Sequence, residues 1–181
     1  MYTIKNLRFH KGHEGEPCAQ CSVYRDGRKV AEYSDDEHGG EPRFMWKDSG
    51  KPRAPFKARD WKGNVCDRYG TEEEARMWAH CLIRPDLVMP DFPDPLPMSP
   101  ELLVSELIEQ QELERARKAE TKRLLRHCKT KLLFRVVGDK PGSWRTIALT
   151  PSCDLSRARK HVCEKYGDKL EEVLNNRLSP E

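Results

Sequence analysis

Large apolar side chains are scarce in this sequence. Leu, Ile, Val and Phe together number 35 of 181 residues, about 19%, which is near the lower edge of what packed cores use. The 33 Lys and Arg and the 30 Asp and Glu residues leave a net charge of only +3, too little for charge repulsion to keep the chain unfolded. We therefore predict thin hydrophobic cores under a large hydrated surface, in one domain or in two small ones.

Long apolar runs are also missing. No stretch approaches the roughly 18 residues that cross a bilayer, and the N-terminal residues 1–12 lack the apolar segment of a signal peptide. The seven cysteines are odd in number and irregularly spaced, which argues against a secreted disulfide scaffold. These absences predict a cytoplasmic protein with no membrane partner.

Familiar catalytic motifs are absent as well. The patterns G-x-S-x-G, the P-loop and H-E-x-x-H do not occur, although each would indicate a nucleophile, a nucleotide or a catalytic zinc. His80-Cys81 and His127-Cys128 are neighbours on predicted helices, so their side chains diverge and do not form a dyad. We predict a non-enzymatic protein without a cofactor. A metal- or thiol-dependent enzyme is the third-ranked alternative.

One pair of cysteines has metal-ligand spacing. Cys18-Ala-Gln-Cys21 follows His10 and His13, and these are residue types that bind zinc. No second C-x-x-C completes a four-ligand set, and residues three apart on a strand face opposite sides of it. We therefore predict no bound metal. His10, His13, Cys18 and Cys21 are weak candidate ligands, and two half-buried strand cysteines are the favoured interpretation.

Residues 1–84 predict an N-terminal antiparallel β-meander closed by one helix. Residues 18–24 and 29–33 flank Asp26-Gly27, the strongest short hairpin signal, and residues 2–9 supply a neighbouring strand. Residues 56–69 predict a second hairpin with Gly63 in its turn. A capping box from Thr71 to Glu74 starts the helix, which ends before Pro85 because proline disfavours helix in the preceding residue.

A proline-rich segment, residues 85–100, separates this domain from the rest of the chain. Its six prolines exclude both an α-helix and the hydrogen-bond ladder of a β-sheet. We therefore predict an extended and stiff linker or strap. Apolar side chains in it are expected to lie in a groove of the N-terminal domain, with a second protein as the alternative. They are Leu87, Val88, Met89, Phe92 and Leu96.

Residues 101–181 predict a C-terminal α+β domain of order α-β-β-α-α. Its first helix starts at Ser99-Pro100 and is so polar from residue 109 to 123 that it bridges solvent or packs on a partner. Residues 131–137 and 144–150 form a hairpin, and helices are predicted from Leu155 to Tyr166 and again from Asp168. The fold class is therefore α+β, in two small lobes.

Two groups of basic residues are the candidate binding surfaces. Four bases recur at helical spacing and form a stripe on the polar helix, and others alternate with aromatic residues in segment 43–62, a mixture suited to single-stranded nucleic acid. The plainer interpretations are a solvated helix face and core aromatics. The candidate residues for a protein or nucleic-acid partner are Arg115, Lys118, Lys122, Arg126, Arg43, Lys47, Trp46 and Trp61.

Acidic and basic residues are segregated along the chain. Residues 85–110 carry six acids and no base, and residues 111–131 carry eight bases and three acids. If these neighbouring segments pair with each other, the basic stripe is neutralised within the protein.

Two stretches carry a resemblance to other proteins. VYRDGRKVAEYSDDEHGG (23–40) and KLLFRVVGDKPGSWRTIAL (131–149), the latter followed by EKYGDKLEEVLN (164–175), resemble a loose group of small uncharacterised phage and plasmid accessory proteins. The group has no agreed catalytic motif, so no functional residue is carried over. The resemblance implies a mobile-element protein made inside a bacterial host cell, similar to anti-CRISPR and other counter-defence inhibitors.

Two hypotheses of function follow. The first is a non-enzymatic phage or mobile-element protein that occludes a charged surface of a bacterial host protein or nucleoprotein complex. The second is an accessory protein that binds DNA or RNA directly with the same basic and aromatic residues. A net charge of +3 and a pI of about 8.4 are low for a dedicated nucleic-acid binder.

Overall fold

The protein folds as two compact units, Met1–Glu112 and Leu113–Glu181. A computed structural model describes residues 1–35, 40–88 and 93–175. Those residues form nine strands, all paired antiparallel, and three α-helices, which confirms the predicted α+β class. The two units divide within a helix and not at the proline-rich segment, so the division differs from the predicted domains 1–84 and 101–181.

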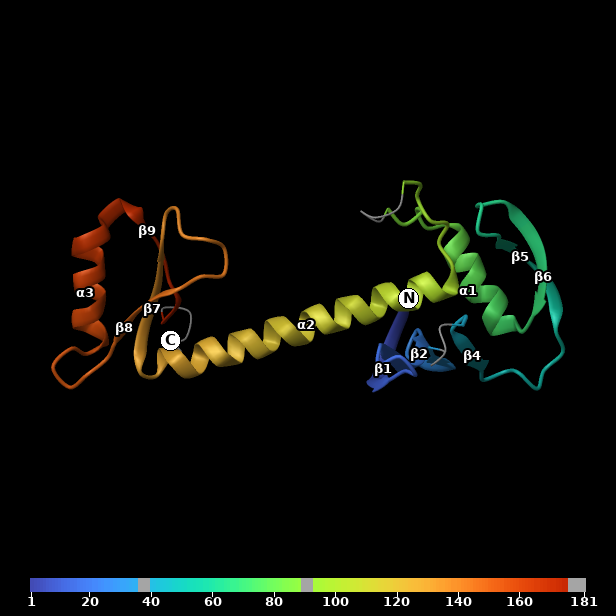
Figure 1. The fold of residues 1–181 in the computed structure, drawn as a ribbon, viewed down its shortest axis with the longest axis horizontal. Coiled ribbons are helices and arrows are strands. Elements are labelled where there is room, and N and C mark those ends of the chain that lie inside the picture. Colours follow the sequence, from blue (N-terminus) through green and yellow to red (C-terminus); the bar gives the residue numbers. More distant parts are fainter. Residues whose placement is uncertain (36–39, 89–92, 176–181) are drawn as a thin grey trace. The chain divides into compact units, whose positions relative to one another are not determined.

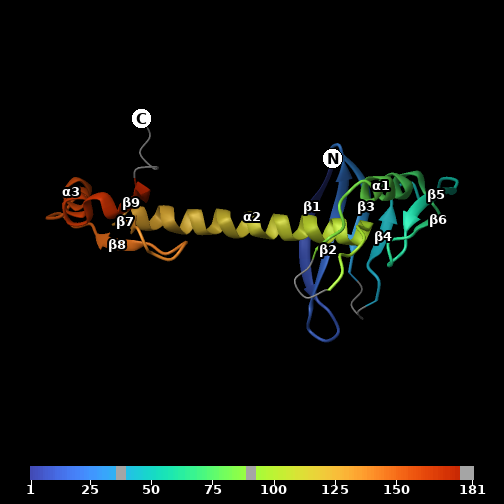
Figure 2. The same cartoon turned by 90° about the horizontal axis from the view of Figure 1, so that it is seen from above.

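The first unit opens with a four-stranded meander (Figures 1 and 2). Its strands are β1 (Tyr2–Lys11), β2 (Pro17–Arg25), β3 (Arg28–Ser34) and β4 (Arg43–Trp46), in that order across the sheet. Asp26 and Gly27 both have positive φ, at 50° and 81°, as the predicted two-residue hairpin turn requires. One face of the sheet supplies buried side chains of the first core, among them Val23, Ala31 and Tyr33.

A second hairpin and a helix complete the first unit. Strands β5 (Ala54–Arg59) and β6 (Val65–Gly70) pair around Gly63, whose φ is 85°. Helix α1 (Glu72–Leu82) begins at the predicted capping box, in which Thr71 and Glu74 bond reciprocally. Its buried face, formed by Met77, Trp78 and Cys81, faces the core, and the helix lies beside β5 (Figure 1).

The proline-rich segment is not extended, which corrects the prediction for it. The backbones of Leu87 and Leu96 exchange two hydrogen bonds of 2.8 Å, so the chain between them turns back on itself. Met98 is only 3% exposed and belongs to the first core, and Leu87 packs against that core. Leu87 therefore lies against its own domain, as expected, whereas Val88 is 76% exposed and does not. Met89 and Phe92 lie outside the described residues.

Helix α2 (Pro100–Cys128) starts at the predicted proline. Leu103 and Val104 are buried in the first core, which explains why the first unit extends to Glu112. Every residue from 112 to 123 is exposed, as the loss of apolar residues in the sequence predicts. Among the described residues, no helix has the length and apolar character needed to cross a membrane.

The second unit is a three-stranded sheet with one helix. Strand β7 (Lys131–Val136) lies between β8 (Arg145–Ala148) and β9 (Leu170–Val173). Helix α3 (Leu155–Tyr166) packs Ala158 and Val162 onto β7, and Gly167 ends it with a φ of 48°. After the short 3₁₀ turn η1 (Gly167–Lys169), the chain forms β9.

The last element corrects the predicted order α-β-β-α-α to α-β-β-α-β. A final helix from Asp168 was expected, but residues 170–173 pair with β7 as a strand. Leu170 and Val173 still pack against the second core, because the register irregularity beside Val136 turns both side chains toward it. The local sequence therefore predicts the wrong backbone conformation here, because the free edge of β7 decides it.

Asn175 joins three parts of the second unit. Its side-chain oxygen accepts a 2.8 Å hydrogen bond from the backbone N–H of Leu133, and its amide donates to the carbonyls of Cys128 and Lys131 at 3.1 and 3.0 Å. The residue is 4% exposed. One buried amide thus satisfies backbone groups at the end of α2 and in β7.

We predict that Asn175→Ala lowers the free energy of unfolding of the second unit by about 2–3 kcal/mol, because buried backbone groups lose their partners. Asn175→Asp should be at least as damaging, since a carboxylate would face two carbonyls. Urea denaturation with amide hydrogen exchange in β7 measures the effect, and exposed Asp168→Asn is the control. Wild-type exchange in Asn175→Ala would contradict the assigned role.

Candidate functional site

An exposed tryptophan stands at the tip of the β5–β6 hairpin. Trp61 is 82% exposed, yet the turn that carries it is well ordered. Oδ1 of Asp60 accepts backbone hydrogen bonds from Lys62 and Asn64 at 2.9 and 2.8 Å, the geometry of an Asx turn. The side-chain bond from Asn64 is the main cause of a lowered Asp60 pKa, so the carboxylate is charged at neutral pH. These hydrogen bonds therefore fix the backbone of the turn from which the large apolar ring of Trp61 extends into solvent.

A second tryptophan lies in the wall behind this turn. Trp78 is 5% exposed and belongs to the buried face of α1. The guanidinium of Arg68, on β6, lies over its ring at 4.9 Å from the centroid, a cation–π arrangement. Among the described residues, Arg68 has no carboxylate within ion-pair distance. The exposed surface of Trp78 is thus covered by a cation that no acid neutralises directly.

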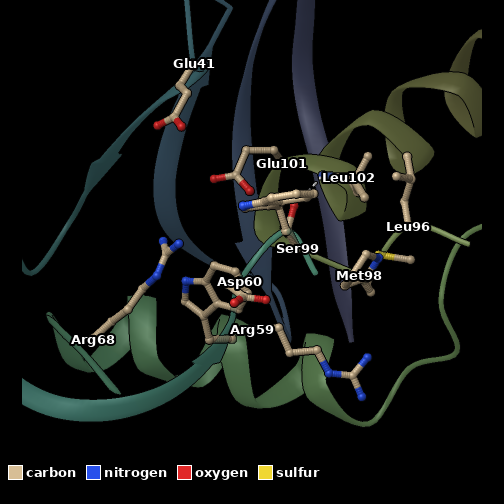
Figure 3. Close-up of a pocket in the computed structure, with 12 residues that line it drawn as sticks. Glu41, Arg59, Asp60, Arg68, Leu96, Met98, Ser99, Glu101 and Leu102 are labelled. Carbon is tan, nitrogen blue, oxygen red and sulfur yellow. Dashed lines mark hydrogen bonds between the residues drawn. The ribbon is translucent and has the colours of Figure 1, made fainter. Parts of the chain in front are cut away.

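A cavity of about 290 Å³ opens beside these two rings (Figure 3). Its walls come from the β5–β6 turn, β6, α1, the chain before α2 and the first turn of α2. All of these belong to the first unit. Its lining residues are Glu41, Arg59, Asp60, Trp61, Arg68, Trp78, Leu96, Pro97, Met98, Ser99, Glu101 and Leu102.

Two further cavities continue from the first. The second, of about 280 Å³, shares Arg68, Trp78 and Glu101 with it and reaches β4. The third, of about 430 Å³, lies farther along β4. We call the three together the tryptophan groove. Residues that line only the second or third cavity are Phe44, Met45, Trp46, Ser49, Arg53, Thr71, Glu74 and Pro100.

The aromatic rings on β4 form the far wall of the groove. The rings of Phe44 and Trp46 are stacked, with centroids 5.1 Å apart and planes at 9°. Tyr33 meets Phe44 edge to face at 5.2 Å. Both β4 rings pack partly against the first core, so this wall is rigid and apolar.

The charges in the groove are mixed and not basic. The first cavity has two arginines, Arg59 and Arg68, and three acids. Arg59 is already occupied, because its guanidinium bonds Asp86 at 2.6 Å and the carbonyl of Leu82 at 3.4 Å. Arg68 is therefore the lining cation left to balance Glu41, Asp60 and Glu101. Even with the ammonium of Lys62, which lies 4.8 Å from the Trp61 ring centroid, acids outnumber bases at the first cavity.

The structure separates the two predicted bases of segment 43–62, Arg43 and Lys47, from the groove, whereas Arg53 and Arg59 of the same segment line it. Arg43 on β4 and Lys47, which follows the strand, alternate with Phe44 and Trp46, and the burial alternates with them. Successive strand residues face opposite sides, and neither Arg43 nor Lys47 lines one of the three cavities. Trp46 and Trp61 do line connected cavities. The predicted aromatic residues are thus brought to one site, without the two predicted bases.

The basic stripe lies in the second unit. Arg115, Lys118, Lys122 and Arg126 fall in the exposed part of α2, and Lys118 pairs with Glu114 at 2.6 Å. Two acids from the acidic segment have partners in the first unit instead of the stripe. Asp86 pairs with Arg59 at 2.6 Å, and Glu106 pairs with Arg84 at 2.9 Å. Those two acids therefore do not neutralise the stripe.

The weak metal candidates are placed on the first sheet and its β1–β2 turn. His10 lies opposite Cys18 in the β1–β2 register, whereas Cys21 is part of the first core. Burial raises the pKa of the Cys21 thiol to about 12, and that of Cys81 likewise to about 12, which disfavours the thiolate that binds zinc. In residues 1–35, 40–88 and 93–175, no three His, Cys, Asp or Glu side chains gather as a metal site.

Sequence reasoning missed three residues at the centre of the groove, Arg68, Trp78 and Glu101. Trp78 lies on the buried face of α1, where helical periodicity marks it as a core residue. Its second role depends on β6, because only the folded hairpin sets Arg68 over the ring. Glu101 is one of many acids near a helix start, and no pattern in the sequence distinguishes it.

Comparisons with known proteins give no relative. No protein-family model matches the chain, and no curated protein and no solved structure is significantly similar to it. The resemblance to phage and plasmid accessory proteins stays a prediction.

We predict that iodoacetamide at about pH 8 labels the exposed Cys163 rapidly but labels Cys21 and Cys81 only after unfolding. With pKa values of about 12, roughly one in 10,000 of the two buried thiols is ionised at that pH. Peptide mass spectrometry measures the labelling. A chelator should change nothing, and chelator-induced labelling of Cys18 and Cys21 would instead indicate a bound metal.

Proposed function

We propose that this protein is a non-enzymatic binding protein that holds a segment of a partner protein in the tryptophan groove. The observation that carries the proposal is Trp61, which is 82% exposed on an ordered turn at the mouth of connected cavities. A free protein gains nothing from leaving an indole in water, because burying a large aromatic side chain is favourable. A partner that covers Trp61 would recover that free energy.

The groove has the composition of a protein-binding hot spot. Tryptophan and arginine are the residues most enriched at such positions, and here Trp61, Trp78 and Arg68 line one cavity. The Asx turn fixes the backbone that carries Trp61, and stacking and core packing hold the rings of Phe44 and Trp46 in place before binding. Such preorganisation lowers the entropy lost on association.

Charge favours a polypeptide over a nucleic acid in this groove. A phosphate backbone needs several unpaired cations along its path. The first cavity instead has three acids, Glu41, Asp60 and Glu101, and Arg59 is bound to Asp86. A strand of phosphates would meet net repulsion there, whereas a protein segment can offer side chains of either sign.

The proposal includes a phage or mobile-element origin and a bacterial host protein or nucleoprotein complex as the partner. Its support is the resemblance of residues 23–40, 131–149 and 164–175 to phage and plasmid accessory proteins. Inhibition would then work by occlusion, with the anchored partner unable to use the covered surface. No catalytic step is part of the proposal.

We predict that tagged full-length protein retains a specific host protein from a bacterial lysate and that Trp61→Ala loses most of it. Loss of a central aromatic anchor weakens binding by about 2 kcal/mol or more, roughly 30-fold. Ile83→Ala is the matched control, because Ile83 is also 82% exposed but lines none of the described cavities. Nuclease treatment should not release the partner. Equal retention by wild type and Trp61→Ala, or loss of the partner with nuclease, would contradict the proposal.

A second candidate function belongs to α2. In residues 112–127 six bases outnumber three acids, and Lys122 and Arg126 have no partner among the described residues. Together with Arg115 and Lys118 they share one side of the helix. An exposed basic face of this kind can bind a phosphate backbone without reading its sequence.

If this face binds duplex DNA, log Kd should change with log salt with a slope of about 3 to 4, close to 0.9 for each neutralised phosphate. The double variant Lys122→Glu and Arg126→Glu should reduce the slope by about 2. Arg117→Glu with Arg123→Glu makes the same change of net charge on other sides of the helix, and it should preserve the slope. Fluorescence anisotropy across a salt series measures it. Identical slopes for both double variants would eliminate the basic face as the contact.

A further inference from the structure

We infer that the first cavity of the tryptophan groove accepts a basic side chain, arginine or lysine, of the partner. The inference deepens the proposed function and rests on it, because it names the chemistry of the residue that enters. It combines the cavity of about 290 Å³ with two indole rings and three carboxylates that line it. This volume is at the lower end of ligand pockets, and it suits one long side chain better than a whole ligand.

The rings of the cavity already attract cations within the protein. The ammonium of Lys62 lies 4.8 Å from the centroid of the Trp61 ring, and the guanidinium of Arg68 lies 4.9 Å from that of Trp78. Tryptophan is the strongest cation–π acceptor among the side chains. Trp61, at 82% exposed, keeps surface that a cation from a partner can use, whereas Arg68 covers the small exposed part of Trp78.

Carboxylates supply the complementary charge. Glu41, Asp60 and Glu101 come from three separate parts of the first unit and line the same cavity. In Figure 3 the side chains of Glu41 and Glu101 extend into the space that Arg68 also enters. Hydrogen bonds from Asn64 and Lys62 lower the pKa of Asp60. A cation in the cavity would gain charge-assisted contacts as well as aromatic ones.

Substitution of Arg68 tests the inference, because it should change the affinity for a basic ligand and for an acidic ligand in opposite directions. As the cation over Trp78, it occupies an attractive surface and adds positive charge to the cavity. Its removal should strengthen the binding of a basic side chain. If the groove instead binds an anion, a phosphate or an acidic peptide, removal of Arg68 should weaken binding. The two alternatives therefore predict opposite effects of one substitution.

The probe is Nα-acetyl-arginine methylamide, titrated into the ¹⁵N-labelled full chain. The indole N–H signals of Trp61 and Trp78 should shift in a saturable way, with an affinity in the millimolar range expected of one side chain. Nα-acetyl-citrulline methylamide has nearly the same shape without the charge, and it should cause shifts at least about 5-fold weaker. Equal shifts with citrulline would overturn the inference.

Three variants sharpen the test. Glu101→Gln and Trp61→Ala should each weaken arginine binding by about 3- to 10-fold, and Arg68→Gln should strengthen it by about 3-fold. Glu109→Gln, on the same helix but outside the cavity, is the control for a change of charge alone. Weaker binding in Arg68→Gln would overturn the inference. Retention of a host protein that depends on Trp61, without any response to arginine, would leave the proposed function intact and reject only the basic side chain.

Discussion

The packing of α1 is the constraint on which the first unit depends. Met77, Trp78 and Cys81 bury one side of the helix against the core, and β5 lies along it. This contact ties the β5–β6 hairpin to the four-stranded sheet, although no strand pairing joins the two sheets among the described residues. The space between them becomes the tryptophan groove. Trp78 therefore serves both as a core residue and as the wall of a binding site.

The same arrangement explains how a protein with few apolar residues presents an apolar site. Aromatic rings provide much buried area for each residue, and four of them line the groove. The backbone hydrogen bonds of the Asp60 turn hold Trp61 outside the core. An indole that was free to rotate into a nearby apolar surface would present no defined site. The exposed position of Trp61 is therefore set by the hydrogen bonds of the turn.

Charge is organised locally in this chain, and its net value conceals this. The acids Asp86 and Glu106 pair with Arg59 and Arg84 inside the first unit. The first cavity keeps an acidic excess, while the exposed part of α2 keeps a basic one. The first unit thus offers an acidic cavity to a partner, and the second unit offers a basic helix face.

Local signals in the sequence determined most of the elements: the Asp26-Gly27 turn, the Thr71 capping box, the helix start at Pro100 and the stop at Gly167 each act through neighbouring residues. Only tertiary structure decided the rest. Residues 170–173 became a strand because β7 offered a free edge, and Leu87 pairs with Leu96 within the proline-rich segment. The groove likewise joins residues 41 to 102 that are distant in the chain. Periodicity reports which side of an element is buried, but it carries no information about which element will face it.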